Sequence, residues 1–342
     1  MIRSAGKKRG YWIIFSLVIG LVPGGCDKSA SRNTSYLFTT PAQYREMVTI
    51  NGNTVTGSGS KGVFISGNTI TLTSYKIAKY ETTWELWDEV ATWARSHGYT
   101  FTLDAGYQGH QVAGAFPELG TTDESHGWTP DQKKTRPVTF ISWHDTIVWC
   151  NAYSETSGLE PVYIASDGKT ILKNASDGIA CDEARMKSGA NGYRLPTEAQ
   201  WEYAARGGNP NDTTNWNYIY AGINDIGTGN QQLGEYAWYN SNSYDLGGDN
   251  KDYGVHPVGT KAANGAGLYD MSGNVWEWCW NSYDTNVITD SGTDPAGPGT
   301  GAFRVVRGGN WSFSASFCGV TYRYYNYPYG KLPGIGFRVV CP

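Results

Sequence analysis

Apolar residues recur at helical spacing in three short stretches of the chain, and each stretch follows a capping signal. The capping pairs are Thr82 with Glu85, Ser142 with Asp145, and Thr197 with Gln200. In such a pair the first side chain accepts from the helix backbone and the second reaches back to the cap. Glycines follow each stretch, at Gly98, Gly158 and Gly207–Gly208. We therefore predict three short helices before Gly208.

From about Gly208 onward the chain has no comparable helical pattern. Gly, Asn, Asp, Tyr and Trp alternate there with brief strand-like runs, such as residues 303–306 and 336–340. The 342 residues include 44 glycines, 24 tyrosines and 14 tryptophans, with 39% hydrophobic and 17% charged residues. This mixture suits short strands, tight turns and loops held by rings, and it excludes collagen-like, coiled-coil and polybasic nucleic-acid-binding classes.

Residues 57–62 read Gly-Ser-Gly-Ser-Lys-Gly and match the dinucleotide-binding fingerprint letter for letter. That fingerprint has to open a helix, so that the pyrophosphate meets the helix N-terminus. Strand-like residues 63–65 and 69–72 follow it here instead. We interpret the segment as a hairpin turn.

The N-terminal residues 1–25 are typical of an export signal. Four basic residues precede an apolar run over residues 11–22, which is shorter than the ~20 residues of a membrane span. Small residues then precede Cys26, which resembles the lipobox of bacterial lipoproteins and implies lipidation of that cysteine. Pro23 is atypical of a lipobox, and an uncleaved anchor or an ordinary secretory peptide is the alternative. We expect an exported chain anchored by lipid in a membrane, at the outer membrane or cell surface.

Removal of the signal leaves 23 basic and 31 acidic residues, a net charge of −8. Such a charge makes nucleic acid an unsuitable partner. Polar residues 27 to about 40 are typical of a tether. We therefore divide the chain into a signal (1–25), a lipidated tether and lead-in (26–55) and one folded, monomeric domain (56–342).

Cysteine and histidine give little support for a zinc site. Five cysteines follow Cys26, an odd number, so at least one is unpaired, and their pairing stays open. They are Cys150, Cys181, Cys279, Cys318 and Cys341. The five histidines show no metal-ligand spacing.

Four blocks, in one order, resemble the sulfatase-modifying, formylglycine-generating enzyme family. They are residues 192–208, which begin Gly-Tyr-Arg-Leu-Pro-Thr-Glu; 267–278, which end Gly-Asn-Val-Trp-Glu-Trp; 307–311, Arg-Gly-Gly-Asn-Trp; and 336–338, Gly-Phe-Arg. The resemblance spans roughly residues 60 to 342. It implies an α+β domain with an elaborated C-type lectin fold, few short helices, short strands and much irregular loop. Each block also has a plain structural interpretation: Val275 and Glu277 alternate with Trp276 and Trp278, as along a strand.

The enzymes of this family oxidise a substrate cysteine to formylglycine with two thiols that bind copper and activate oxygen. The resemblance places those thiols at Phe313 and Cys318 of this chain. Phenylalanine binds no soft metal and forms no disulfide. We therefore predict no catalytic residues and no required cofactor.

The same resemblance implies a structural calcium at four positions. They are the side chains of Asp270 and Glu277 and the carbonyls of Gly273 and Val275. Oxygen ligands of this kind suit Ca²⁺. The alternative is that both acids hydrogen-bond the loop that contains them.

Residues 312–334 have the composition of a binding loop. They hold five tyrosines and no acidic residue, together with Ser, Gly and Asn. Tyrosine supplies a rigid ring and a hydroxyl at low entropic cost, whereas Ser, Gly and Asn adapt their hydrogen bonds. The alternative is an aromatic patch that contacts the protein's own core.

Residues 304–341 also resemble the C-terminal variable region of proteins diversified by retroelements, among them variable lipoproteins of spirochaetes. In such regions mutated adenines change asparagine codons to a restricted set of residue types. Between frame residues such as Ala315, Cys318 and Arg323, the chain holds only permitted types. These predicted ligand-binding positions are Ser312, Phe313, Ser314, Ser316, Phe317, Gly319, Thr321, Tyr324, Tyr325, Asn326, Tyr327, Tyr329, Gly330, Leu332, Pro333 and Gly334.

Three functions follow from these features. The first, which we favour, is a surface-displayed lipoprotein that binds a variable protein or glycan through its C-terminal loops. The second is a formylglycine-generating oxidoreductase. The third is a housekeeping envelope lipoprotein. Burial of residues 312–334 would support this third function.

Overall fold

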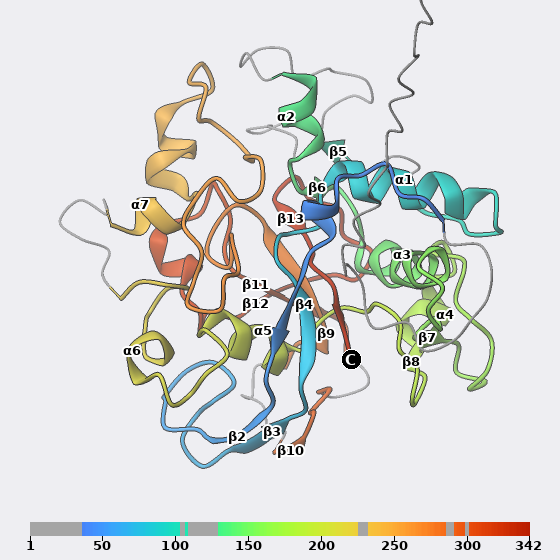
Figure 1. Ribbon diagram of the computed structural model, residues 1–342, viewed down its shortest axis with the longest axis horizontal. Coiled ribbons are helices and arrows are strands. Elements are labelled where there is room, and N and C mark those ends of the chain that lie inside the picture. The colour runs from blue at the N-terminus through green and yellow to red at the C-terminus, as the bar shows by residue number, and fades with distance from the viewer. Residues whose placement is uncertain (1–35, 103–106, 109–128, 225–231, 285–290, 298–300) are drawn as a thin grey trace, which may run out of the picture.

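The computed structural model describes residues 36–102, 107–108, 129–224, 232–284, 291–297 and 301–342. The signal, Cys26 and most of the predicted tether lie outside these ranges. The helices are α1 (Trp84–Arg95), α2 (Pro130–Lys134), α3 (Trp143–Thr156), α4 (Gly178–Asp182), α5 (Glu198–Ala205), α6 (Thr213–Trp216) and α7 (Leu233–Tyr236), with 3-10 turns η1 (Ala42–Arg45), η2 (Asn240–Asn242), η3 (Tyr244–Leu246) and η4 (Ala315–Cys318). Helices α1, α3 and α4 lie on one side of the central strands, and α6 and α7 lie on the other (Figure 1).

Two of the three predicted capping pairs are confirmed and one is wrong by a residue. Ser142 caps α3 and Thr197 caps α5, each in a complete capping box. Helix α1 is capped by Thr83, whose hydroxyl accepts from the Leu86 amide. Thr82 cannot serve as the cap because its backbone is paired on both sides, with Phe337 and Val138.

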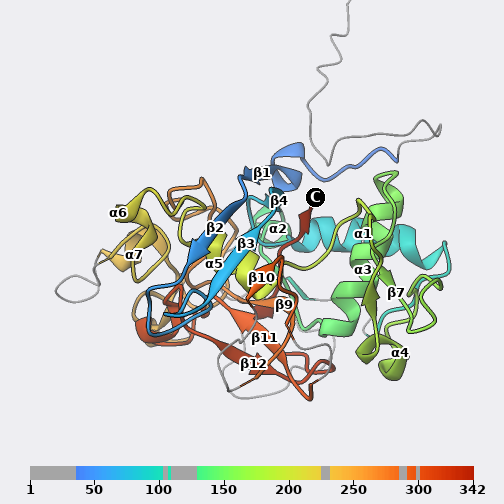
Figure 2. The same cartoon turned by 90° about the horizontal axis from the view of Figure 1, so that it is seen from below.

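The strands are short and form several small sheets. They are β1 (Met47–Ile50), β2 (Asn53–Thr56), β3 (Thr69–Leu72), β4 (Tyr75–Ala78), β5 (Tyr107–Gln108), β6 (Val138–Thr139), β7 (Tyr163–Ile164), β8 (Arg185–Met186), β9 (Trp276–Ser282), β10 (Gly292–Thr293), β11 (Arg304–Arg307), β12 (Tyr324–Asn326), β13 (Ile335–Gly336) and β14 (Val340–Cys341). The largest sheet has the order β12-β11-β9-β13, with β12 at its edge (Figure 2). The predicted loop-rich α+β fold is confirmed.

Strand β9 forms the centre of this sheet, and all seven of its residues are buried. The predicted alternation is present: Trp276 and Trp278 belong to the hydrophobic core that includes α1 and α3, whereas Cys279 belongs to a second core around α5. Seven consecutive buried residues with alternating faces mean that β9 separates two cores. It is therefore a rigid base for whatever lies at its ends.

The ends of the described body meet in a second sheet, β1-β4-β14. Met47 pairs with Ala78, and Val340 pairs with Ile77, so the chain's C-terminal strand completes a sheet begun near residue 47. The folded body therefore includes part of the predicted lead-in of residues 26–55. Thr40 supports this extension, because its amide and hydroxyl both donate to Glu89.

The glycine-rich residues 57–62 lie in the connection between β2 and β3, which pair antiparallel as a hairpin. The predicted turn is confirmed. Residues 63–65 do not form a strand of their own, since only Ile65 makes an isolated bridge, with Gly59. Val63 and Phe64 are nevertheless buried and belong to the core around α5.

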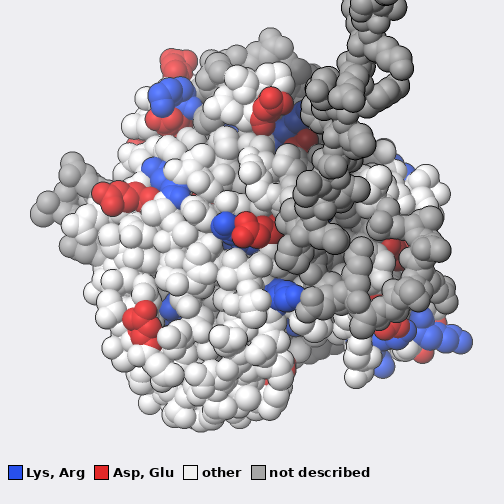
Figure 3. All heavy atoms as spheres, in the orientation of Figure 1, with Lys and Arg blue, Asp and Glu red and all other residues white. Residues whose placement is uncertain are grey.

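The surface carries charges of both signs, and the interior holds free thiols. On the face shown in Figure 3, basic and acidic residues are interspersed, with no field of a single sign. Cys150, Cys181, Cys279 and Cys318 are buried free thiols, as the odd cysteine number predicted for at least one of them. Within the described ranges, no helix combines the length and the apolar character needed to cross a bilayer.

Candidate ligand-binding site

The segment 312–334 is held to the body through its backbone. The amides of Trp143 and His144, at the start of α3, both donate to the carbonyl of Pro328. The amide of Trp276 donates to the carbonyl of Gly334 at 2.8 Å, and the amide of Phe140 donates to that of Leu332 at 3.2 Å. Main-chain bonds of this kind are independent of the side chain at the accepting residue. The path of the segment is thus fixed without use of most of its side chains.

One frame side chain adds a strong polar anchor. Arg323 donates from Nε and Nη2 to the two carboxylate oxygens of Glu198, at 2.6 and 2.9 Å. Glu198 is fully buried at the start of α5, and it also pairs with Arg307 of β11 at 3.2 Å. A two-point guanidinium–carboxylate contact fixes orientation as well as position. Arg323 therefore fastens the base of β12 to a helix that lies far away in sequence.

The predicted binding positions divide by exposure. Those that are exposed, of which we call the last five the aromatic face, are Ser314, Ser316, Tyr324, Tyr325, Tyr327, Tyr329 and Leu332. Those that are half-buried are Ser312, Phe313, Phe317, Thr321, Asn326, Gly330 and Pro333. Ala315, Cys318, Val320 and Pro328 of the frame are buried. These four side chains of the frame thus point inward, and most of the intervening ones reach the surface.

Gly319 and Gly334 do not fit the prediction, because both are buried. A Cβ at Gly334 would lie 2.1 Å from Nδ2 of Asn310, a distance that requires displacement of that side chain. Asn310 is itself held, since its Oδ1 accepts from the amide and hydroxyl of Ser312. Gly334 therefore serves as a backbone anchor and not as an exchangeable surface position.

The aromatic rings of this region form one continuous series of contacts. Successive ring centroids are 4.6 to 5.6 Å apart in the order Phe317, Phe313, Trp276, Tyr324, Tyr325, Phe303, Tyr327 and Tyr329. Contacts at these distances stabilise each other beyond their area alone. The rings are therefore ordered before any ligand arrives, although the tyrosines stay 38–63% exposed.

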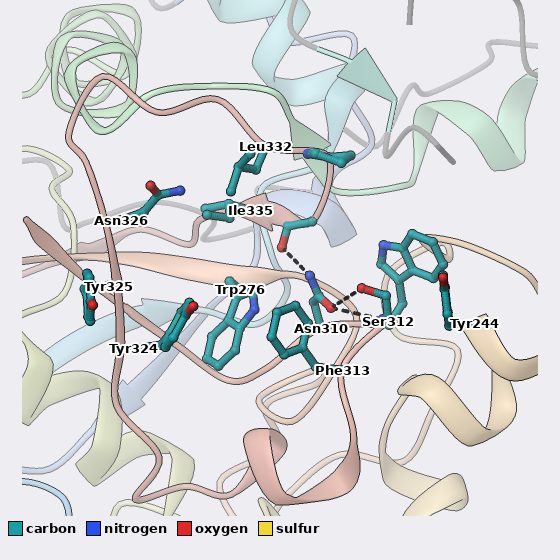
Figure 4. Close-up of a pocket in the computed structure, with 13 residues that line it drawn as sticks. Tyr244, Trp276, Asn310, Ser312, Phe313, Tyr324, Tyr325, Asn326, Leu332 and Ile335 are labelled. Atoms are coloured by element: carbon teal, nitrogen blue, oxygen red, sulfur yellow. Dashed lines mark hydrogen bonds between the residues drawn. The ribbon is translucent and has the colours of Figure 1, made fainter. Parts of the chain in front are cut away.

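A pocket of about 540 Å³ opens beside this series, between the aromatic face and η3. Figure 4 shows Tyr244 on one side of it, Tyr324 and Tyr325 on the other, and Leu332 above Ile335. It is lined by Tyr244, Trp276, Asn310, Trp311, Ser312, Phe313, Tyr324, Tyr325, Asn326, Leu332, Pro333, Gly334 and Ile335. No charged side chain is among these residues.

Sequence reasoning missed five of the lining residues. They are Tyr244, Trp276, Asn310, Trp311 and Ile335. Trp276, Asn310 and Trp311 lie in the family blocks 267–278 and 307–311, and Ile335 directly precedes the block 336–338, so these blocks were the available signal. Tyr244 has no local signal, because it reaches the pocket from a separate loop.

The two positions that correspond to the family's thiols lie at this region. Phe313 lines the pocket and contacts Trp276, with ring centroids 5.6 Å apart. Cys318 is fully buried, and burial raises the pKa of its thiol to about 12. A thiolate is the form that attacks and binds metal, so Cys318 is a poor nucleophile at neutral pH.

Comparisons with known proteins show the family of the chain. The model of the sulfatase-modifying factor enzyme 1-like domain family matches residues 34–342. The chain belongs to this family. The "Chaperone protein LppX" of Paenibacillus barcinonensis, which is 32% identical, aligns over 96% of this chain and 98% of its own length.

Two further matches cover different shares of this chain. The formylglycine-generating enzyme of Streptomyces coelicolor is 36% identical, over 43% of this chain and 46% of that enzyme. Among solved structures, Treponema denticola variable protein 1 superposes with a TM-score of 0.62 and 29% identity, over 86% of this chain and 94% of that one. The chain is thus similar both to a protein named as an enzyme and to a protein named as variable.

The residues predicted to hold calcium have other partners. Both oxygens of Glu277 accept from Arg338, and one accepts from Trp201 as well, each at 2.7 Å. Glu277 and Arg338 are completely buried, so a cation would have to displace a paired guanidinium. Glu277 therefore does not fit the predicted role. Among the described residues, no three His, Cys, Asp or Glu side chains gather as a metal site.

Asp270 and the two carbonyl positions lie in the loop that enters β9. One oxygen of Asp270 accepts from the Gly259 amide at 2.7 Å, and the other is buried without a donor among the described residues. Burial raises the pKa of Asp270 to about 6. Gly273 has φ +83° and donates to the carbonyl of Gly308, and Val275 donates to Glu81. The loop is therefore fixed by hydrogen bonds of its own.

Proposed function

We propose that this family member is a non-catalytic lipoprotein, displayed on the cell surface, that binds a protein or glycan through the aromatic face and the adjoining pocket. The observation that carries the proposal is that the residues which attach segment 312–334 to the body differ from those which face solvent. Frame residues and backbone carbonyls make the attachments, whereas the tyrosines remain largely exposed. A segment of this kind can change its side chains without losing its path.

The phenylalanine at position 313 and the burial of Cys318 support a binding role over oxidation of a substrate cysteine. Phe313 offers no ligand for copper, and the raised pKa of Cys318 keeps its sulfur protonated at neutral pH. The competing activity is formylglycine generation. Conversion of a cysteine-containing peptide to the aldehyde by the purified chain with copper and oxygen, measured by mass spectrometry, would overturn the proposal.

Display at the surface rests on residues 1–26 and on the folded body. The basic and apolar segments of the signal and the position of Cys26 support export and lipidation. Mass spectrometry of the chain made in its own host tests this part: a diacylglyceryl group on a mature N-terminal Cys26 is expected. An intact N-terminus or an unmodified cysteine would contradict it.

The binding role is tested by two display libraries on yeast. The first randomises the exposed positions 314, 316, 324, 325, 327, 329 and 332, and the second randomises the frame positions 315, 320, 323 and 328. Most members of the first library should resist protease as the parent does, and variants that bind a chosen protein such as lysozyme should be selectable. Most members of the second should be cleaved. Equal cleavage of both libraries would refute the distinction between attaching and exposed residues of segment 312–334.

The predicted diversification has its own test in the genome. The gene's neighbourhood should hold a reverse transcriptase gene and an adenine-rich near-copy of codons 304–341. Sequencing the region decides this directly. If neither is found, the surface is a fixed binding site and not a diversified one.

A further inference from the structure

The pocket beside the aromatic face has a floor and a rim of different origin. Its floor consists of residues that are almost completely buried and lie outside the predicted binding positions, namely Trp276, Trp311, Ile335 and Asn310, with the backbone of Gly334. Its rim consists of predicted binding positions, including Phe313, Tyr324, Tyr325 and Leu332, together with Tyr244 from η3 (Figure 4). Exchange of the rim would leave the floor unchanged.

The chemistry of this floor is apolar and uncharged. Trp276 is 2% exposed, and rings of Phe313 and Tyr324 contact it, the second in a stacked arrangement. The side-chain amide of Asn310 already has partners within the protein, because its Nδ2 donates to the Gly334 carbonyl and its Oδ1 accepts from the Ser312 amide. A ligand group that enters would therefore meet rings and aliphatic side chains, with the indole N–H of Trp311, which is buried without an acceptor among the described residues, as a free donor.

These features favour an apolar side chain over a sugar as the entering group. Each hydroxyl of a sugar that is buried without a partner costs free energy, and this floor offers few partners. An aromatic or large aliphatic side chain loses nothing of that kind and gains the contact area of the rings. Buried anchors of this type, surrounded by a rim of tyrosines, are the usual hot spots of protein interfaces.

We propose that the pocket receives a protruding loop of a protein partner, anchored by an aromatic or large aliphatic side chain that rests on the Trp276 and Trp311 floor. The proposal rests on the proposed function and names its ligand class. The absence of charged lining residues makes the contact insensitive to salt. The floor supplies the same anchor preference whichever residues occupy the rim.

The experiment uses small probes and ligand-observed NMR on the intact domain. N-acetyl-tryptophanamide and N-acetyl-leucinamide represent the anchor, N-acetyl-glycinamide is the matched probe without a side chain, and methyl α-mannoside and methyl N-acetyl-β-glucosaminide represent glycans. The first two should give saturation-transfer signals at millimolar concentration, with little change between low and high salt. The other three should give none.

Two variants place the binding in the pocket. Leu332→Arg puts a bulky charge at the mouth, at a side chain that is 43% exposed, and should weaken the tryptophanamide signal by about tenfold or more. Ile179→Ala, which truncates an apolar side chain of α4 that is 75% exposed and lies outside the lining, should change it by less than about twofold. Circular dichroism confirms that both variants are folded.

The outcomes separate this inference from the proposed function. Saturation by the glycosides, or equal signals from the glycinamide and the tryptophanamide, would overturn the inference. An unchanged tryptophanamide signal in Leu332→Arg would do the same. The libraries described above can still succeed in that case, because they test whether the surface tolerates exchange and not which group fills the pocket.

Discussion

Replacement of Arg323 by methionine tests whether frame side chains, and not the aromatic face, hold the segment in place. Arg323 makes a two-point contact with Glu198, and the exposed fractions of the two side chains are 10% and 0%. Methionine keeps much of the apolar stem and removes the guanidinium. Glu198 would then be left with Arg307, at 3.2 Å, as its other cationic partner.

The expected loss of stability follows from this geometry. Removal of one partner from a buried pair costs about 3–5 kcal/mol, and the remaining contact with Arg307 places the expected loss near 3 kcal/mol. For a domain of this size, that corresponds to a fall in Tm of about 6–12 °C. Arg323→Lys, which keeps the charge and loses the two-point geometry, should fall between wild type and Arg323→Met.

The matched surface change is Tyr329→Ala, at a ring that is 63% exposed. Truncation of the small covered part should cost about 1 kcal/mol, or a fall of about 2–4 °C in Tm. Differential scanning calorimetry of the three variants and the wild type measures both effects. The reasoning fails if Tyr329→Ala is as destabilising as Arg323→Met, or if Arg323→Met leaves the Tm unchanged.

Three further predictions concern the anchors, the buried acid and the thiol. Gly334→Ala should lower the free energy of unfolding by about 1–3 kcal/mol in urea titrations, because its Cβ would displace Asn310; a neutral result would show that the segment moves freely. Burial raises the pKa of Asp270 from 3.8 to about 6, so its contribution to stability is complete below about pH 4 and is lost as the pH rises through about 6. The wild type should therefore lose stability relative to Asp270→Asn over that range. Urea midpoints of the two proteins that run parallel from pH 4 to 7 would contradict this. Cys318, with a thiol pKa of about 12, should react with an aromatic disulfide reagent at pH 8 only after unfolding, and rapid labelling of the native chain, located by peptide mapping, would refute its burial.

Local signals explain why much of the fold was predictable. The capping boxes of α3 and α5 and the alternation of β9 each depend on residues within a few positions of one another. The error at α1 has the opposite origin. The sequence favours Thr82 through its spacing to Glu85, but the pairing of the Thr82 backbone with Phe337 and Val138 leaves Thr83 as the cap.

The candidate site was predictable only in part, for the same reason. Composition and frame spacing indicated that residues between the frame positions of 312–334 face solvent, and those that are exposed are Ser314, Ser316, Tyr324, Tyr325, Tyr327, Tyr329 and Leu332. Burial of Gly319 and Gly334 carries no such signal, because glycine fits both a surface turn and a crowded anchor. Tyr244 enters the pocket from η3, which only the path of the chain could reveal.

The sequence by itself determined the family, the short capped helices, the two faces of β9 and the absence of a thiol at Phe313, because each is written in neighbouring residues or in one ordered set of motifs. The tertiary structure decided the partners of the buried charges. Arg323 meets Glu198 across 125 positions, and Glu277 meets Arg338 across 61 and so does not fit a calcium ligand. It also decided the pocket, because a concave surface exists only where elements distant in the chain come together. Contacts of that range depend on the packing of the whole domain, which no local pattern contains.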